Sequence, residues 1–136
     1  MKKSNRWFFL LMITAASLDS AGQSAQFTDH SIQAGLGGNY LNHTASVADF
    51  DLDGDLDVYV GSRLAPNTLY RNEGGAEFAA VVAGVEDDGF TMASLFFDFD
   101  NDGDPDLFSC NNGDANRFWR NDGGAFTDVS EELGLN

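Results

Sequence analysis

The chain is poor in positive charge and in cysteine. Its 136 residues hold 7 Lys and Arg against 22 Asp and Glu, which gives a formal net charge of -15. Such a surface repels nucleic acid and anionic membranes, so we expect neither as a partner. Because Cys110 is the single cysteine, no disulfide can form within the chain. A small exported domain then needs another stabilising element, and a bound metal ion can provide one.

The residue patterns of familiar catalytic sites are also missing. His30 and His43 are the two histidines, and neither lies in a recognisable catalytic spacing with a Ser or Cys. The sequence has no Gly-rich phosphate loop, no nucleophile elbow and no zinc signature. These absences predict that the protein is not an enzyme.

The longest apolar run is short and lies at the N-terminus. It covers Trp7–Leu18, follows a basic start and precedes small residues. This order predicts a signal peptide over residues 1–22, cleaved between 22 and 25, rather than a membrane anchor or a buried strand. We therefore expect a secreted protein, extracellular or periplasmic, that does not insert into a membrane after cleavage. The basic residues left would be Arg63, Arg71, Arg117 and Arg120.

Aspartate, in contrast, is abundant and concentrated in two nine-residue windows. Both windows read Asp-x-Asp-x-Asp-Gly-Asp-x-Asp. The first, 49–57, contains Asp49, Asp51, Asp53, Asp55 and Asp57, and the second, 98–106, contains Asp98, Asp100, Asp102, Asp104 and Asp106. A solvated acidic turn explains this pattern poorly, because five like charges repel each other and no basic residue stands between them.

This pattern predicts two calcium sites, with about two Ca²⁺ per chain. Calcium takes six to eight oxygen ligands, and alternating Asp side chains in a curling loop can supply several of them. The glycine after the third Asp permits a sharp turn. The loop begins like an EF-hand, but Val60 and Ser109 occupy the place of the EF-hand's twelfth-position Glu, and the flanking segments read as strands. Magnesium fits less well, because it prefers strict octahedral geometry and keeps its waters.

The two windows belong to a repeat with a shift of 49 residues. Leu69-Tyr70-Arg71-Asn72 aligns with Phe118-Trp119-Arg120-Asn121, and a further match joins Phe27-Thr28-Asp29 to Phe126-Thr127-Asp128. This alignment predicts the end of a preceding repeat at 27–43, a first repeat at 44–92 and a second repeat at 93–136. The recurring aromatic residues favour packing between repeats over stacking on sugars.

Each repeat has the alternation of short strands. We expect strands over 44–50, 56–60, 68–71 and 78–81, and their counterparts in the second repeat. Four strands per repeat of this length predict an all-β fold of two four-stranded, propeller-blade-like repeats. Because propellers typically close with four to eight blades, the expected architecture is a partial or fragmentary β-propeller.

With these motifs, the sequence resembles the FG-GAP/VCBS repeat family, in which an Asp-rich calcium loop lies in a β-propeller blade, as in integrin α-chains. The Leu-Tyr-Arg-Asn and Phe-Thr-Asp motifs are most similar to the repeats that precede ASPIC/UnbV domains. The resemblance implies side-chain ligands at the first, third, fifth and ninth loop positions. It also implies that the seventh residue, Asp55 or Asp104, binds through its carbonyl.

The expected function is a non-enzymatic interaction or adhesion module within a larger propeller. We expect it to bind a protein or glycan and no nucleic acid. The alternative is a fragment or subunit of a propeller-type polysaccharide-active enzyme or lectin. Two open repeats also predict self-association or pairing with further repeats. Asn42 begins a short N-glycosylation pattern, Asn-His-Thr, which is a weak signal.

Overall fold

The computed structural model describes residues 27–37 and 41–135, so the expected signal peptide lies outside the described residues. Within this part of the chain there are eight strands and no helix. No helix long and apolar enough to cross a membrane was found there.

The strands form two four-stranded antiparallel sheets, each in simple sequence order. The first sheet consists of β1 (Asn42–Ala48), β2 (Asp57–Ser62), β3 (Thr68–Asn72) and β4 (Phe78–Val81). The second consists of β5 (Thr91–Phe97), β6 (Asp106–Asn111), β7 (Arg117–Asp122) and β8 (Ala125–Asp128). The prediction of an all-β fold with two blade-like repeats is confirmed, and the described sheets form no closed ring.

The strands nearly coincide with the alternating segments of the sequence. β1 begins at Asn42, two residues before the expected segment, and its pairing with β2 contains a register shift between Asn42 and Thr44. β5 has the same irregularity between Thr91 and Ala93. The repeated bulge shows that both copies adopt the same pairing, including its defect.

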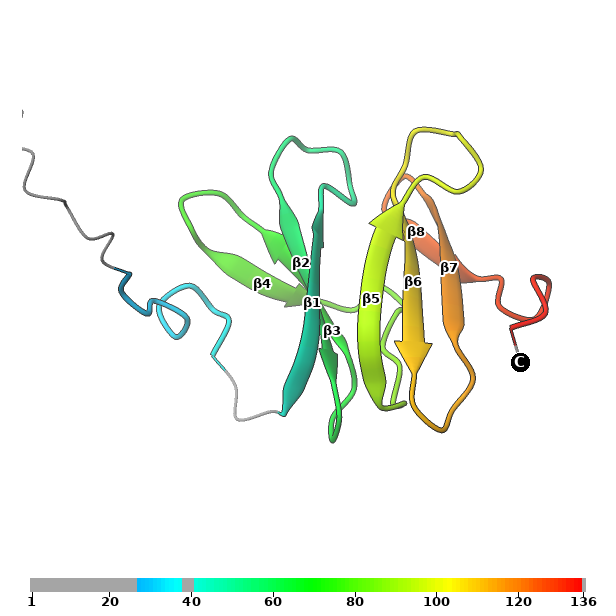
Figure 1. Ribbon diagram of the computed structural model, residues 1–136. Coiled ribbons are helices and arrows are strands. Elements are labelled where there is room, and N and C mark those ends of the chain that lie inside the picture. Colours follow the sequence, from blue (N-terminus) through cyan, green and yellow to red (C-terminus); the bar gives the residue numbers. More distant parts are fainter. Residues whose placement is uncertain (1–26, 38–40, 136) are drawn as a thin grey trace, which may run out of the picture.

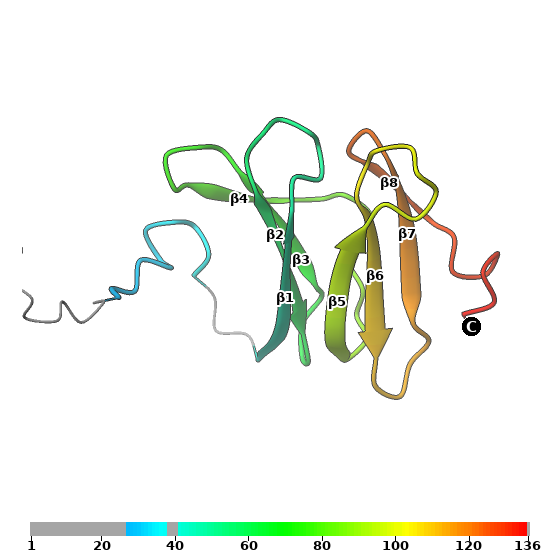
Figure 2. The ribbon, with the colours of Figure 1, turned by 45° about the horizontal axis from the view of Figure 1, so that its top comes forward.

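The two sheets stand side by side, and β1 lies next to β5 (Figures 1 and 2). The acidic loops 49–57 and 98–106 both lie at the upper end in Figure 1, together with the β3–β4 and β7–β8 turns. The β2–β3 and β6–β7 connections lie at the opposite end. Both acidic loops are therefore presented on one end of the molecule.

The core lies between the facing sheets. Tyr59 and Leu69 of the first sheet, Leu107 and Trp119 of the second, and Val85 of the linker are all nearly inaccessible to solvent. Fully burying side chains of this size stabilises the fold by about 1.5–3 kcal/mol each. Both sheets and the linker thus contribute to one hydrophobic core.

A buried polar network crosses the same interface. The Tyr59 hydroxyl donates to the Val85 carbonyl at 3.2 Å and accepts from Asn67 Nδ2 at 2.8 Å. Asn67 Nδ2 also donates to Thr91 Oγ1 at 2.7 Å, and Thr91 Oγ1 donates to Asn111 Oδ1 at 2.8 Å. Burial raises the pKa of Tyr59, so its hydroxyl keeps the proton that it donates.

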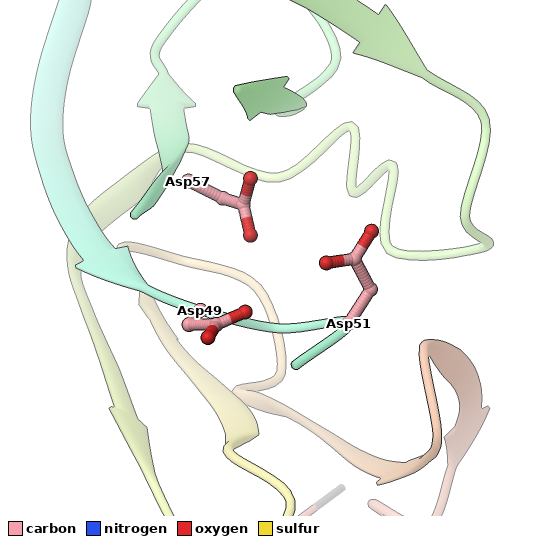
Figure 3. Close-up of side chains that lie close together, drawn as sticks. All are labelled: Asp49, Asp51 and Asp57. Carbon is pink, nitrogen blue, oxygen red and sulfur yellow. The ribbon is translucent and has the colours of Figure 1, made fainter. Parts of the chain in front are cut away.

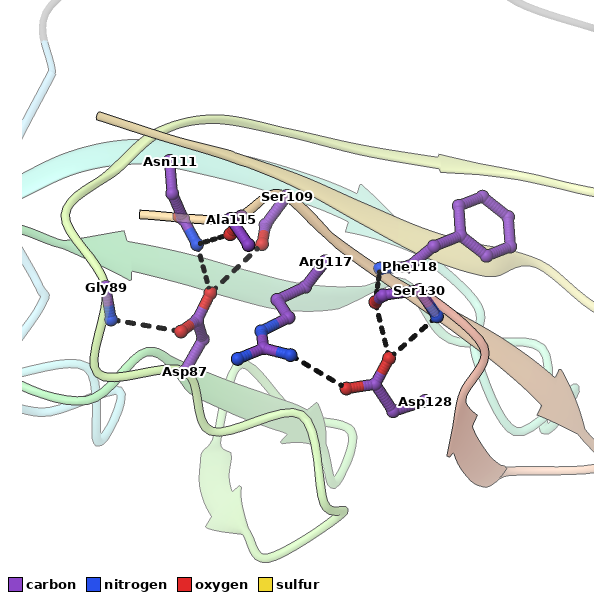
Figure 4. A network of polar contacts seen from close by, with 9 residues as sticks. All are labelled: Asp87, Gly89, Ser109, Asn111, Ala115, Arg117, Phe118, Asp128 and Ser130. Atoms are coloured by element: carbon purple, nitrogen blue, oxygen red, sulfur yellow. Dashed lines mark hydrogen bonds and ion pairs between the residues drawn. The ribbon is translucent and has the colours of Figure 1, made fainter. Parts of the chain in front are cut away.

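The linker residue Asp87 completes this network on the second sheet. Figure 4 shows its carboxylate accepting from the Gly89 backbone amide, Asn111 Nδ2 and Ser109 Oγ. The linker is consequently fixed to both sheets, which defines their relative orientation.

We expect Tyr59→Phe to lower the free energy of unfolding by about 1–3 kcal/mol, because the buried Val85 carbonyl loses its donor. Thermal or urea unfolding would measure the change. Tyr70→Phe, at the partly exposed tyrosine on β3, is the matched control and should change stability little. Equal effects of the two variants would contradict the role of the network.

Candidate metal centre

Each acidic loop follows the same unusual backbone path. The fourth loop residue has a positive φ in both copies, 58° at Leu52 and 63° at Asn101. The sixth residue, Gly54 or Gly103, has φ near 100°, where a side chain would be strained. The glycine predicted to allow a sharp turn does so, and an additional left-handed residue precedes it.

This path brings three of the five carboxylates together in each loop. Oxygen atoms of Asp49, Asp51 and Asp57 all lie within 4.8 Å of one another, and Figure 3 shows the three side chains pointing into a common space. The second loop gathers its first, third and ninth positions in the same way, through Asp98, Asp100 and Asp106.

The fifth and seventh positions lie outside these clusters. Asp53 Oδ1 accepts from the Asp55 backbone amide at 2.9 Å, and Asp102 Oδ1 accepts from that of Asp104 at 3.0 Å. Asp104 Oδ2 accepts from the Gly123 amide in the β7–β8 turn. The side chains of Asp53, Asp102 and Asp104 therefore brace the loops. The side-chain ligand role expected for Asp53 and Asp102 and the carbonyl role expected for Asp55 and Asp104 stay predictions.

The ninth residue is the anchor of each loop. Asp57 is fully buried at the start of β2, where its carboxylate accepts from the Phe50 amide at 3.0 Å and from the Asn72 amide at 2.8 Å. Asp106 makes the equivalent bonds with Phe99, at 2.7 Å, and Asn121, at 2.8 Å. One carboxylate thus ties the loop entrance, strand two and strand three of its repeat together.

Burial is the main influence on the ionisation of Asp57. It raises the pKa of this carboxyl, and the charges of Asp51 and Asp53 raise it further, whereas the amides of Asn72 and Phe50 lower it. The pKa of Asp100 is also raised, first by desolvation and then by the charge of Asp102. The fold therefore holds these carboxylates close together at an electrostatic cost that a cation would offset.

The first loop has oxygen atoms suited to a cation. Within the described residues, Asp49 Oδ1 and Asp51 Oδ1 are buried without a hydrogen-bond partner. Burying an unpaired carboxylate oxygen is unfavourable, so a ligand is expected there. The donors are all hard oxygens, which fit calcium and do not favour a soft metal ion.

The arginines do not neutralise the loops. Arg71 pairs with Glu73 at 2.6 Å, and Arg120 pairs with Asp122 at 3.0 Å. Arg117 pairs with Asp128, and Arg63 lies over the Phe90 ring. In the part of the chain described here, none of the four forms an ion pair with an acidic loop, whose charge remains available to a cation.

Two functional residues were underestimated from the sequence, Asn72 and Asn121. Each caps its turn, since their Oδ1 atoms accept from the backbone amides of Gly74 and Gly124. In addition, Asn121 Nδ2 donates to the carbonyl of Phe50 in the first acidic loop at 2.8 Å. The recurrence of Asn in register was the available signal, but only the packed sheets reveal the contact between repeats.

Comparison with known families agrees with this arrangement. A family model described as FG-GAP-like repeat matches residues 49–109 and 98–135. The chain belongs to the FG-GAP-like repeat family. Each match begins at the first Asp of an acidic loop, so both loops of this FG-GAP-like repeat protein fall within the family pattern. A search of curated proteins found no match. The finer resemblance to VCBS repeats and to those before ASPIC/UnbV domains stays a prediction.

We expect Leu52→Asn to stabilise the protein by about 0.5–1 kcal/mol, because asparagine tolerates the left-handed backbone better than leucine. The second loop provides the reciprocal variant, Asn101→Leu, which should destabilise by a similar amount. Thermal unfolding of both variants measures the effects. A loss of stability in Leu52→Asn would contradict the assigned backbone strain.

Proposed function

We propose that this protein is a secreted calcium-binding repeat protein that acts as a non-enzymatic interaction or adhesion module for a protein or glycan. The main support is the pair of convergent carboxylate clusters, with the buried, unpartnered oxygens of Asp49 and Asp51 in the first. The basic apolar N-terminal sequence supports export.

In this proposal, Asp49, Asp51 and Asp57 hold one Ca²⁺, and Asp98, Asp100 and Asp106 hold a second. A bound cation would supply positive charge that relieves the repulsion among the carboxylates. Asp57 and Asp106 are already fixed by two backbone amides each, so their role is to hold the other ligands of the loop against β2 and β6. The loops would then present a rigid surface at one end of the two sheets.

The polar surface near the linker is the place to look for a catalytic site, as the enzyme alternative would require. A pocket there is lined in part by Asp87, Arg117 and Asp128. Arg117 and Asp128 form an ion pair at 3.4 Å, and Asp87 is engaged by Asn111 and Gly89 (Figure 4). Because these charged groups already have partners within the protein, the pocket favours a structural role. Turnover of an acidic polysaccharide in the presence of calcium would support the enzyme alternative instead.

We expect calorimetry on chelator-treated protein to give about two Ca²⁺ per chain. Asp49→Ala combined with Asp98→Ala should abolish both sites, because each change removes a convergent carboxylate. Asp88→Ala with Asp114→Ala is the matched control, since both are exposed acids outside the loops and the net charge changes equally. Full stoichiometry in the loop variant would refute the assignment.

Calcium removal should also lower the melting temperature. A ligand that binds only the folded state at a hundred times its dissociation constant stabilises that state by about 2.7 kcal/mol per site. High salt should lessen the effect of the chelator, because it screens the repulsion among the carboxylates. Scanning calorimetry with calcium and with chelator tests this expectation, and identical melting in both would show that calcium does not stabilise the fold.

A further inference from the structure

The two sheets of the chain pack through unlike faces. The face of the first sheet that meets the second is here called the front face, and it carries Phe50, Tyr59 and Leu69. The face of the second sheet that meets the first is called the back face, and it carries Phe96, Leu107 and Trp119. The interface is therefore head-to-tail, and each sheet also has the other kind of face.

Contacts across this interface are specific. The Tyr59 ring lies 6.4 Å from Phe96 and 6.5 Å from Trp119, and the Phe50 ring lies 5.9 Å from Phe126. Between β1 and β5, Ser46 Oγ lies 2.9 Å from Ser94 Oγ. Aromatic packing and a few polar contacts thus join the front face to the back face.

The repeat places a second front face on the outer side of β5–β8. Phe99, Phe108 and Phe118 correspond to Phe50, Tyr59 and Leu69, and their rings pack against one another. Phe99 is 49% exposed, whereas its counterpart Phe50 is 5% exposed. Leu95 on the same face is 55% exposed. An apolar, aromatic surface of this kind marks an interface.

A second back face lies on the outer side of β1–β4. Val47, Val58 and Tyr70 correspond to Phe96, Leu107 and Trp119. Val47 is 54% exposed, whereas its counterpart Phe96 is partly buried against the core. The chain therefore carries both halves of a second interface of the kind that already joins its own sheets.

We propose that a second copy of this chain docks its first sheet onto the front face of the second sheet. The internal contacts, shifted by one repeat, then pair Phe108 with Tyr70 and Val47. They also pair Phe99 with Phe78, which is the counterpart of Phe126 because the turn before it is one residue longer in the first repeat. The Ser46–Ser94 contact becomes an apolar contact between Leu95 and Ala45. Each translated pair is chemically compatible, and this compatibility supports a second copy as the occupant.

The neighbouring copy would also complete the second acidic loop. Asn121 Nδ2 donates to Phe50 O at 2.8 Å and to Pro105 O at 3.1 Å. Its counterpart Asn72 makes the bond within the repeat, from Nδ2 to Leu56 O at 3.1 Å. The other N–H of Asn72 Nδ2 would donate to the carbonyl of Phe99 in the neighbouring copy. Consistently, Asp98 and Asp100 are exposed, while Asp49 and Asp51 are half-buried, with Asp51 next to Gly124 in the β7–β8 turn.

One segment must move to allow this docking. Residues 27–36 and 126–135 occupy equivalent places in the repeat and have the same turn, with Leu36 N donating to Ser31 O and Leu135 N donating to Ser130 O. Only one of them fits at the junction. Val129 and Ser130 are buried, whereas Phe27 and Ile32 are 94% and 83% exposed. We therefore infer that 126–135 stays at the interface between the two copies and that 27–36 moves away from it.

The head-to-tail geometry limits the size of the assembly. Such an interface forms a ring when its rotation closes. Because propellers typically contain four to eight blades and the described residues of each copy supply two, a ring of such copies would contain about two to four of them.

Sedimentation velocity of the full chain in calcium tests the assembly. We expect a species of about two to four copies, which Leu95→Glu on the exposed front face should shift to the monomer. Leu64→Glu is the matched control, because Leu64 is 74% exposed in the β2–β3 connection and should not affect association. Every variant keeps the N-terminus of the parent protein. A thermal unfolding transition of each variant shows that the variant folds. A monomeric parent at all concentrations, or equal dissociation by both variants, would overturn the proposal.

A second readout concerns the second acidic loop and rests on the proposed calcium function. In an Asp49→Ala background, which leaves the second loop as the binding site, calcium affinity should increase with protein concentration. Asn72→Ala should weaken that affinity about fivefold at high protein concentration and have less effect in the monomer range, because the lost hydrogen bond comes from the neighbour. Binding independent of concentration would refute this contribution. Absence of any calcium binding would refute the calcium function, while sedimentation would still decide the assembly.

Discussion

The structure depends on a buried carboxylate that opens the second strand of each repeat. Asp57 and Asp106 are fully buried, and each accepts backbone hydrogen bonds from the loop entrance and from the third strand. Burying such a charge is costly without strong partners. The two amides offset part of this cost, and a cation shared with the first and third loop residues would offset more. Loop, sheet and proposed metal site are thereby coupled through one side chain.

A second constraint is the unlikeness of the two faces of each sheet. Aromatic and aliphatic residues of the front face meet a different set on the back face, and Asn121 adds a polar link from the second sheet to the first acidic loop. The packing of repeats and the order of the acidic loop are therefore connected. This connection explains why the first loop, covered by the second sheet, is more buried than the second loop.

Much of this arrangement could be predicted from the sequence, because it depends on local patterns. Alternation along β2 and the turn at Gly74-Gly75 specify the strands, and the two Asp windows point to the loops. Other features depend on side-chain geometry that the residue pattern does not give. The sequence did not reveal that Asp53 braces its own loop or that Arg71 binds Glu73 rather than the loop. The bond from Asn121 to the Phe50 carbonyl requires the relative placement of two sheets, which no single repeat encodes.

In the proposed function, the three convergent carboxylates of each loop hold a calcium ion. A crystal structure of the calcium-loaded protein tests it most directly, through anomalous density at each loop. We expect an ion bound by Asp49, Asp51 and Asp57, and another bound by Asp98, Asp100 and Asp106, at about 2.3–2.6 Å from their oxygens. Well-ordered loops without an ion at saturating calcium, or an ion held elsewhere, would contradict it.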